Sequence, residues 1–179
     1  LFSNVKAKLT LSKDGLLKLT SNRFEIAEGI SSAKVECDLI NQLYKIRLGI
    51  KEVNSDTIAT SLLALSREIT GKASGIIDLY TDKTLKLNGE IKFEVKDGSI
   101  QKVGLVEYIL KFAALFRNPL AMISPSTFSD FVNVPNGDFE RITGVLKLNN
   151  NVINSIKIKS YSPQLSAYVV GMYDIEKSD

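Results

Sequence analysis

The sequence contains no histidine and a single cysteine among its 179 residues, and only four prolines. The absence of histidine removes the commonest general base and the commonest zinc ligand. With Cys37 alone, the chain can form neither an internal disulfide nor a thiolate metal cluster. Cys37 stands on the apolar phase of a predicted strand, so we interpret it as a small buried hydrophobic residue. One cysteine is compatible with either cytoplasm or periplasm. We therefore predict no cofactor, no metal and no enzymatic activity.

The sequence also lacks an uninterrupted membrane-spanning run and a cluster of charges of one sign. Its most apolar stretch, Leu105 to Ile123, is interrupted by Glu107, Lys111 and Arg117. The net charge is +3, and the lysines alternate with Glu and Asn, which is typical of a solvated face and not of a nucleic-acid-binding surface. The chain begins at Leu1, directly in strand-like sequence. We expect one module over residues 1–179, cut from a longer protein whose membrane anchor or targeting segment lies outside it.

The most informative stretch is Thr84 to Phe116. Its first half places Leu85, Leu87, Gly89, Ile91, Phe93 and Val95 in one phase and Lys86, Asn88, Glu90, Lys92, Glu94 and Lys96 in the other. Strict alternation predicts a long strand with one apolar and one charged face. Asp97-Gly98 predicts a hairpin turn, followed by a short strand to Val103. The residues from Gly104 to Phe116 predict a helix that is apolar almost all round and must be buried.

Similar alternation recurs roughly every ten residues, which indicates an antiparallel meander. We expect strands over Val5–Ser12, Leu17–Thr20, Arg23–Ala27, Ala33–Leu39, Tyr44–Lys51, Lys72–Thr81, Asp138–Leu148, Val152–Ser160 and Leu165–Ile175. Turns are expected at Asp14-Gly15 and at Asn149 to Asn151, and a bend or bulge at Gly75. Asn54-Ser55-Asp56 offers the capping groups of a helix start, and Ile58, Leu62, Leu65 and Ile69 form one apolar stripe behind it.

Two short helices cannot cover the sheet that these strands predict. About ten strands at a spacing of ~4.8 Å make a sheet on the order of 45 Å wide, whereas each helix covers a strip about 10 Å wide. We therefore predict a mainly β fold: a long curled antiparallel sheet, shaped as a groove or open barrel, with the two helices on or inside its apolar face. A filled sandwich that binds nothing would give the same alternation.

Two stretches of the sequence carry a family resemblance. They are I-T-G-K-A-S-G-I-I-D-L-Y with L-K-L-N-G-E-I-K-F-E-V-K-D-G-S-I and the following apolar helix, and F-E-R-I-T-G-V-L-K-L-N-N-N-V-I with the final Y-V-V-G-M-Y-D-I. In this order they resemble the C-terminal region of the AsmA-like proteins of Gram-negative bacteria. The matching positions are Gly71, Gly75, Gly89, Asp97, Gly98, Gly144 and Gly171, while Asn150-Asn151 stands where relatives often have a glycine-containing turn. The resemblance covers roughly residues 55 to 176, so we divide the chain into a β-meander (1–54) and an AsmA-like C-terminal region (55–179).

The resemblance implies a periplasmic segment of an inner-membrane-anchored protein. Proteins of this family look like long curled sheets with an apolar interior, thought to help move phospholipid towards the outer membrane, and they offer no catalytic residues to carry over. The expected partner is therefore a phospholipid or another acyl-chain lipid, and the expected role lies in lipid transport and outer-membrane biogenesis. An aliphatic lining without buried charge suits hydrocarbon better than a polar metabolite.

Three hypotheses about function follow. For a lipid-binding or lipid-conducting module, the candidate contacts are Leu87, Ile91, Phe93, Tyr108, Ile109, Phe112 and Leu115, each of which could equally be ordinary core. A second hypothesis is an interaction scaffold for envelope assembly proteins that uses exposed strand edges or the Leu165 to Ile175 strand. The third is an enzyme with a carboxylate site at Asp130, Asp138 and Glu140 near Arg141, which we set aside because solvated loop charges explain these residues better.

Overall fold

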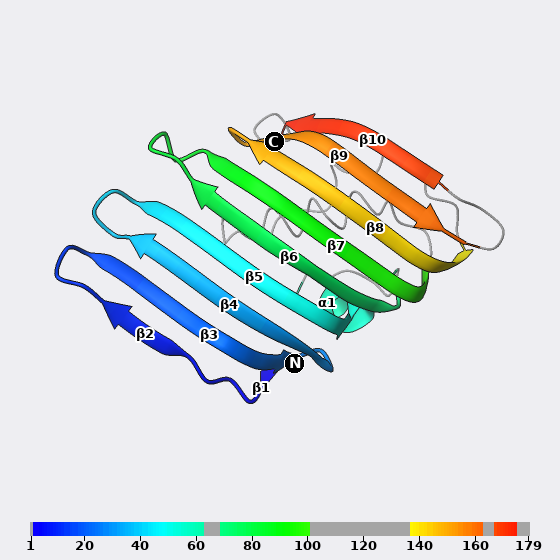
Figure 1. Ribbon diagram of the computed structural model, residues 1–179, viewed down its shortest axis with the longest axis horizontal. Coiled ribbons are helices and arrows are strands. Elements are labelled where there is room, and N and C mark those ends of the chain that lie inside the picture. The colour runs from blue at the N-terminus through cyan, green and yellow to red at the C-terminus, as the bar shows by residue number, and fades with distance from the viewer. Residues whose placement is uncertain (1, 63–68, 101–136, 163–166, 175–179) are drawn as a thin grey trace.

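The computed structural model describes residues 2–62, 69–100, 137–162 and 167–174, which form one antiparallel sheet of ten strands and a short helix (Figure 1). The elements are β1 (Phe2–Ser3), β2 (Lys8–Leu11), β3 (Leu16–Ile26), β4 (Gly29–Asp38), β5 (Leu43–Asn54), α1 (Ser55–Leu62), β6 (Lys72–Thr81), β7 (Leu87–Ile100), β8 (Gly137–Asn149), β9 (Val152–Tyr161) and β10 (Ala167–Asp174). From β3 onward each strand pairs with the next in chain order, and β1 and β2 pair with successive parts of β3 at one edge. The predicted mainly β fold and open antiparallel sheet are confirmed.

The predicted boundary at residue 54 does not interrupt the sheet. β5 ends at Asn54, and its pairs with β6 run from Lys45↔Tyr80 to Asn54↔Lys72. The strands of residues 1–54 and those that follow α1 therefore continue one meander. Within the described residues, no helix is long and apolar enough to cross a membrane.

The β8–β9 turn forms where the sequence predicts it. Asn150 and Asn151 have φ values of 52° and 65°, the left-handed backbone that a tight hairpin requires and that asparagine tolerates better than most residues. Both asparagines also tie the turn to the start of β7. The Leu87 N–H donates to the Asn151 Oδ1 at 2.6 Å, and the Asn150 N–H donates to the Asn88 Oδ1 at 3.0 Å. This turn therefore fixes the register of three strands.

The prediction of a hairpin turn at Asp97-Gly98 is wrong. β7 runs through both residues, and Gly98 and Ser99 go on to pair with Phe139 and Asp138 of β8. Asp97 has a φ of 50°, so the turn-forming residue makes a local kink inside the strand. The pairing with β8 outweighs the local turn preference. Gly98 is required there because an added Cβ would collide with the Thr70 carbonyl oxygen.

Two irregularities adjust the N-terminal strands. The segments predicted as separate strands before and after Asn22 form the single strand β3, with a shift in register between Ser21 and Phe24. The irregularity expected at Gly75 lies in the neighbouring strand instead, between Ile50 and Val53 of β5. Such bulges bend a strand and increase its local twist, which favours a curved sheet.

Helix α1 begins at the predicted cap. The Thr57 N–H donates to the Asn54 Oδ1 at 3.1 Å, and the Ser55 hydroxyl donates to the Gly71 carbonyl at 3.0 Å. Ile58 of α1 packs in a small core with residues of β3 and β5. Ile69, predicted to end this helix, lies instead in a β-bridge. The second predicted helix, from Gly104 to Phe116, lies outside the described residues.

The larger core lies on the same face of the sheet, over the C-terminal strands. It consists of Ile69, Ile77, Leu79, Leu87, Ile91, Val95, Phe139, Ile142, Leu146, Leu148, Ile153, Ile156 and Ile158. The smaller core consists of Phe24, Ile26, Ala27, Val53 and Ile58. The buried side chains are thus concentrated from β6 to β9 and at the end of the sheet beneath α1.

Candidate apolar binding face

One row of side chains crosses the whole sheet on its apolar face. The strand registers connect Leu9, Leu19, Val35, Ile46, Leu79, Gly89, Leu148, Ile153 and Tyr173, one from each strand from β2 to β10. Residues paired in adjacent strands point to the same face. From β2 to β9 this apolar row therefore runs along one face of the sheet without a charged residue.

The apolar row is exposed at its β2 end and buried on β6, β8 and β9. Leu9 on β2 is 63% exposed and Leu19 on β3 is 37% exposed, while Leu79 on β6 is 1% exposed. Val35 and Ile46, which lie between them, are half-buried. Leu11, beside Leu9, is 64% exposed. Exposure thus falls stepwise from the β2 edge to the centre, and the strands β2 to β5 form an accessible apolar shelf.

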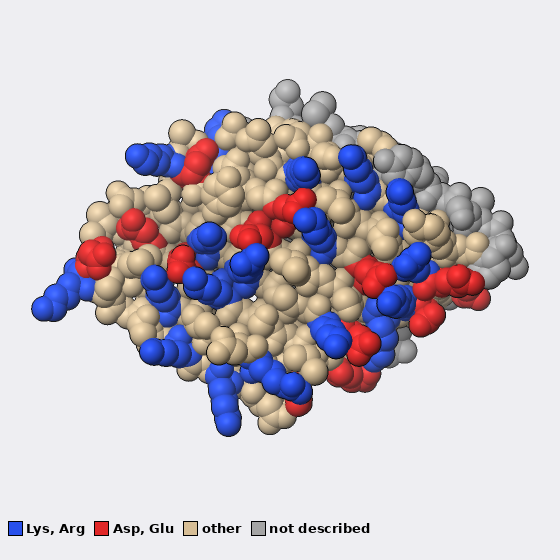
Figure 2. All heavy atoms as spheres, viewed as in Figure 1, with Lys and Arg blue, Asp and Glu red and all other residues tan. Residues whose placement is uncertain are grey.

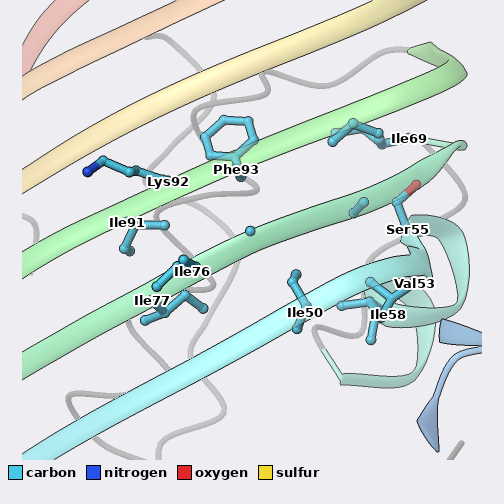
Figure 3. Close-up of a pocket in the computed structure, with 13 residues that line it drawn as sticks. Ile50, Val53, Ser55, Ile58, Ile69, Ile76, Ile77, Ile91, Lys92 and Phe93 are labelled. Atoms are coloured by element: carbon cyan, nitrogen blue, oxygen red, sulfur yellow. The ribbon is translucent and has the colours of Figure 1, made fainter. Parts of the chain in front are cut away.

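A cavity of about 80 Å³ adjoins this shelf beneath α1. Its described lining comes from β5, α1, β6 and β7 and includes Ile50, Ile58, Ile77 and Phe93 (Figure 3). Gly75 of β6 forms part of the cavity floor. An added Cβ at this position would collide with the Lys92 carbonyl oxygen. Glycine at this position therefore both permits close strand pairing and leaves room above the sheet.

The cavity walls offer almost no polar chemistry. Among its described lining residues only Ser55 and Lys92 carry a polar side-chain group. The Ser55 hydroxyl is already used in its hydrogen bond to Gly71. A buried charge or unpaired polar group would be costly against such walls. The cavity can therefore accept a hydrocarbon group but gives little to hold a polar ligand.

Three of the seven candidate lipid contacts lie in the described residues, and four lie outside them. Leu87 and Ile91 are 6% and 4% exposed and belong to the larger core. Phe93 is half-buried, and Ile91 and Phe93 both line the cavity, whereas Leu87 lies at the β8–β9 turn. The remaining candidates, Tyr108, Ile109, Phe112 and Leu115, lie outside the described residues.

The most accessible residues of the apolar face were missed by the sequence-based choice of site. That choice concentrated on the central strand β7, whereas Leu9, Leu11 and Leu19 lie at the N-terminal edge. Their alternation was visible, but alternation does not report which strands remain uncovered. Nor does it reveal the cavity, because Val53 and Ile58 reach it only through the bulge in β5 and the position of α1.

Two of the three carboxylates of the enzyme hypothesis lie in the described residues. Asp138 and Glu140 are exposed on β8, and Asp130 lies outside the described residues. The Arg141 guanidinium stacks 4.8 Å from the ring centroid of Tyr161 and contacts Glu94 at 3.9 Å. No group of three or more His, Cys, Asp or Glu residues in the described part of the chain is arranged to hold a metal ion.

These features define an open apolar shelf, strands β2 to β5, that leads to a hydrocarbon-lined cavity beneath α1. Comparison of the chain with models of known protein families, with curated proteins and with solved structures found no match.

Proposed function

We propose that this chain is a non-enzymatic module that binds or conducts the acyl chains of lipids along its apolar face. The observation that carries the proposal is the apolar row, which crosses the nine strands from β2 to β10 without a charged residue and stays accessible over β2 to β5. Monomeric proteins seldom expose a continuous apolar surface unless something binds there. A flexible hydrocarbon chain suits such a surface because it needs no hydrogen-bonding partner.

The cavity beneath α1 supports the same proposal. Its walls are aliphatic and aromatic, and it lies where the exposed shelf meets the buried core. An acyl chain lying along β4 and β5 could place its terminal carbons between Ile50 and Phe93. Burial of each methylene group favours binding by about 0.8 kcal/mol. A chain of several methylenes would therefore gain enough to offset the loss of its own conformational freedom.

The resemblance of residues 55 to 176 to the AsmA-like family suggests where this activity operates. We propose that the chain is a periplasmic part of an inner-membrane-anchored protein and contributes to phospholipid transport and outer-membrane biogenesis. Glycines at positions 75, 89 and 144 allow the close strand pairing of such a sheet. At each of these positions an added Cβ would collide with the neighbouring strand or its side chains.

An interaction scaffold for envelope assembly is the alternative, and the edge strand β2 favours it. Leu9 and Leu11 are exposed on a strand that pairs with β3 on one side. Exposed edge strands of this kind readily accept a strand from a partner. In that case β2 would bind an envelope protein, and the apolar face would be covered by protein instead of lipid.

The test compares opposite faces of one strand. Val35 of β4 lies on the apolar row, and Ile30 of β4 lies on the charged face, paired with Lys51. We expect the purified chain to carry lipid in native mass spectrometry and to take up a fluorescent fatty acid. Val35→Lys should abolish the uptake, because it places a charge in the path of the acyl chain, and Ile30→Lys should leave it unchanged.

Two results would contradict the proposal. One is a wild-type chain that neither carries lipid nor takes up the fatty acid. The other is equal loss in the two lysine variants while both keep the wild-type circular dichroism spectrum. Capture of an envelope protein that is lost when Leu9 and Leu11 are changed to Lys, without any lipid uptake, would favour the scaffold.

A further inference from the structure

The charged face of the sheet carries a concentration of lysines that the linear sequence does not reveal. Along each strand the lysines alternate with other residues, but the registers of β7, β8 and β9 bring them together. We call this group the basic patch. It consists of Lys92, Lys96, Arg141, Lys147, Lys157 and Lys159. Figure 2 shows basic side chains spread over this part of the sheet face.

Within the described strands β7 to β9, cations outnumber carboxylates on this face. Glu90 and Glu94 are the acidic residues that the described registers place among these cations. Glu94 contacts two cations at once, Lys96 at 3.3 Å and Arg141 at 3.9 Å. The Glu90 carboxylate contacts the ammonium of Lys92 at 2.6 Å. The register partner of Lys157 on β8 is Val145, which carries no charge.

The cations are close enough for their electric fields to add. Lys92 and Lys157 both pair with Val145, so they lie two strands apart, about 10 Å. Lys157 and Lys159 are about 7 Å apart along one strand. Both separations are within or near the Debye length of about 8 to 10 Å at physiological salt. The basic patch therefore acts on an approaching anion as one extended positive surface.

We propose that the basic patch docks the module onto the surface of an anionic phospholipid bilayer. The face of the sheet is broad and its cations come from three adjacent strands, so several can contact headgroup phosphates of one plane simultaneously. A nucleic-acid duplex is a cylinder and would contact a sheet face along one line only. The Arg141 guanidinium stacks on the ring of Tyr161. This face of the Tyr161 ring is therefore occupied and cannot stack on a nucleic-acid base.

This proposal does not depend on lipid binding by the opposite face. The apolar row and the basic patch lie on different sides of the sheet, so each can be tested without changing the other. Contact through the basic patch would hold the apolar face away from the bilayer. The acyl-chain path would then remain free while the module is attached.

The test measures co-sedimentation of the full chain with two kinds of vesicle, phosphatidylcholine mixed with phosphatidylglycerol and phosphatidylcholine alone. We expect binding to the mixed vesicles only, and weakening as salt rises. Lys147→Glu with Lys157→Glu should weaken the binding about tenfold or more, because each basic residue near an anionic surface contributes measurably to the affinity. The matched control is Lys13→Glu with Lys83→Glu, which changes the net charge equally in two exposed turns.

Several results would overturn the proposal. Equal weakening in both double variants would show a net-charge effect, and equal binding to both vesicles would show an apolar contact. Undiminished binding by the patch variant would also contradict it. Tighter binding to a short DNA duplex than to mixed vesicles at the same salt would indicate a nucleic-acid surface instead. If the Glu variant fails to fold beside Glu90, Lys147→Gln with Lys157→Gln removes the same two charges without adding repulsion.

Discussion

The ring of Phe93 on β7 lies directly over Gly144, its register partner on β8. A Cβ at position 144 would overlap the ring. Gly144 thus provides the space that lets Phe93 lie flat on the sheet and form one wall of the cavity beneath α1. A large and a small residue on adjacent strands together make a smooth surface.

Gly144→Ala should therefore destabilise the fold. Overpacking of a tight contact typically costs about 1–3 kcal/mol, and urea unfolding of the variant measures it. Gly137→Ala is the matched control, because no atom lies within 4 Å of a Cβ at that position. Phe93→Leu combined with Gly144→Ala should recover part of the loss. An unchanged unfolding midpoint in Gly144→Ala would contradict the contact.

The exposure gradient along the apolar face predicts different effects at its two ends. Leu146 on β8 is 1% exposed, and Leu146→Ala should lower the free energy of unfolding by about 2–5 kcal/mol. Leu9→Ala removes the same atoms from the exposed β2 edge and should cost less than about 0.5 kcal/mol. Equal losses in chemical denaturation would mean that the β2 edge is as well packed as the core.

The helix cap at Asn54 gives a third prediction. Asn54→Ala removes the acceptor of the Thr57 N–H and should destabilise the fold by about 1 kcal/mol. Asn54→Asp keeps an oxygen in place and should retain most of the stability. Thr60→Ala, an exposed change within α1, is the control. Thermal unfolding followed by circular dichroism compares the variants, and equal melting temperatures for all of them would argue against the cap.

Glu36 gives the fourth prediction, a dependence of stability on pH. A hydrogen bond from the Lys34 ammonium, supported by the positive charges of Lys34 and Lys18, lowers the pKa of Glu36 below its usual value. A lowered carboxylate pKa stabilises the folded state fully above the unfolded pKa, about 4.3 for glutamate, and the contribution is lost as the pH falls through the folded pKa. The wild type should exceed Glu36→Gln in stability at neutral pH, with a gap that closes in acid. A pH-independent gap in parallel urea titrations would contradict this assignment.

Much of the sheet could be predicted from the sequence because one face is buried and the other solvated. That condition makes apolar and polar residues alternate along β4, β6, β7 and β9. The pairing of these strands then follows from their order in the chain. The hairpin at Asn150-Asn151 was also predictable, because asparagine tolerates the left-handed backbone that the turn requires.

The remaining features depended on interactions between distant residues. Asp97-Gly98 has the composition of a turn, yet its pairing with Phe139 and Asp138 keeps it in β7. The cavity needs the bulge after Ile50, the absence of a side chain at Gly75 and the position of α1. The basic patch exists only after β8 and β9 are aligned. Each of these features combines residues that no local pattern connects.

The order of the strands has a consequence for how the chain assembles. Because each strand after β2 hydrogen-bonds to the element that follows or precedes it in the sheet order, folding can proceed by adding one hairpin after another to an existing edge. Deleting β1 and β2 would then remove only their pairing with β3 and leave the strand pairs from β3 to β10 intact. Each strand that joins the sheet in this way provides the hydrogen-bonding edge to which the next strand adds.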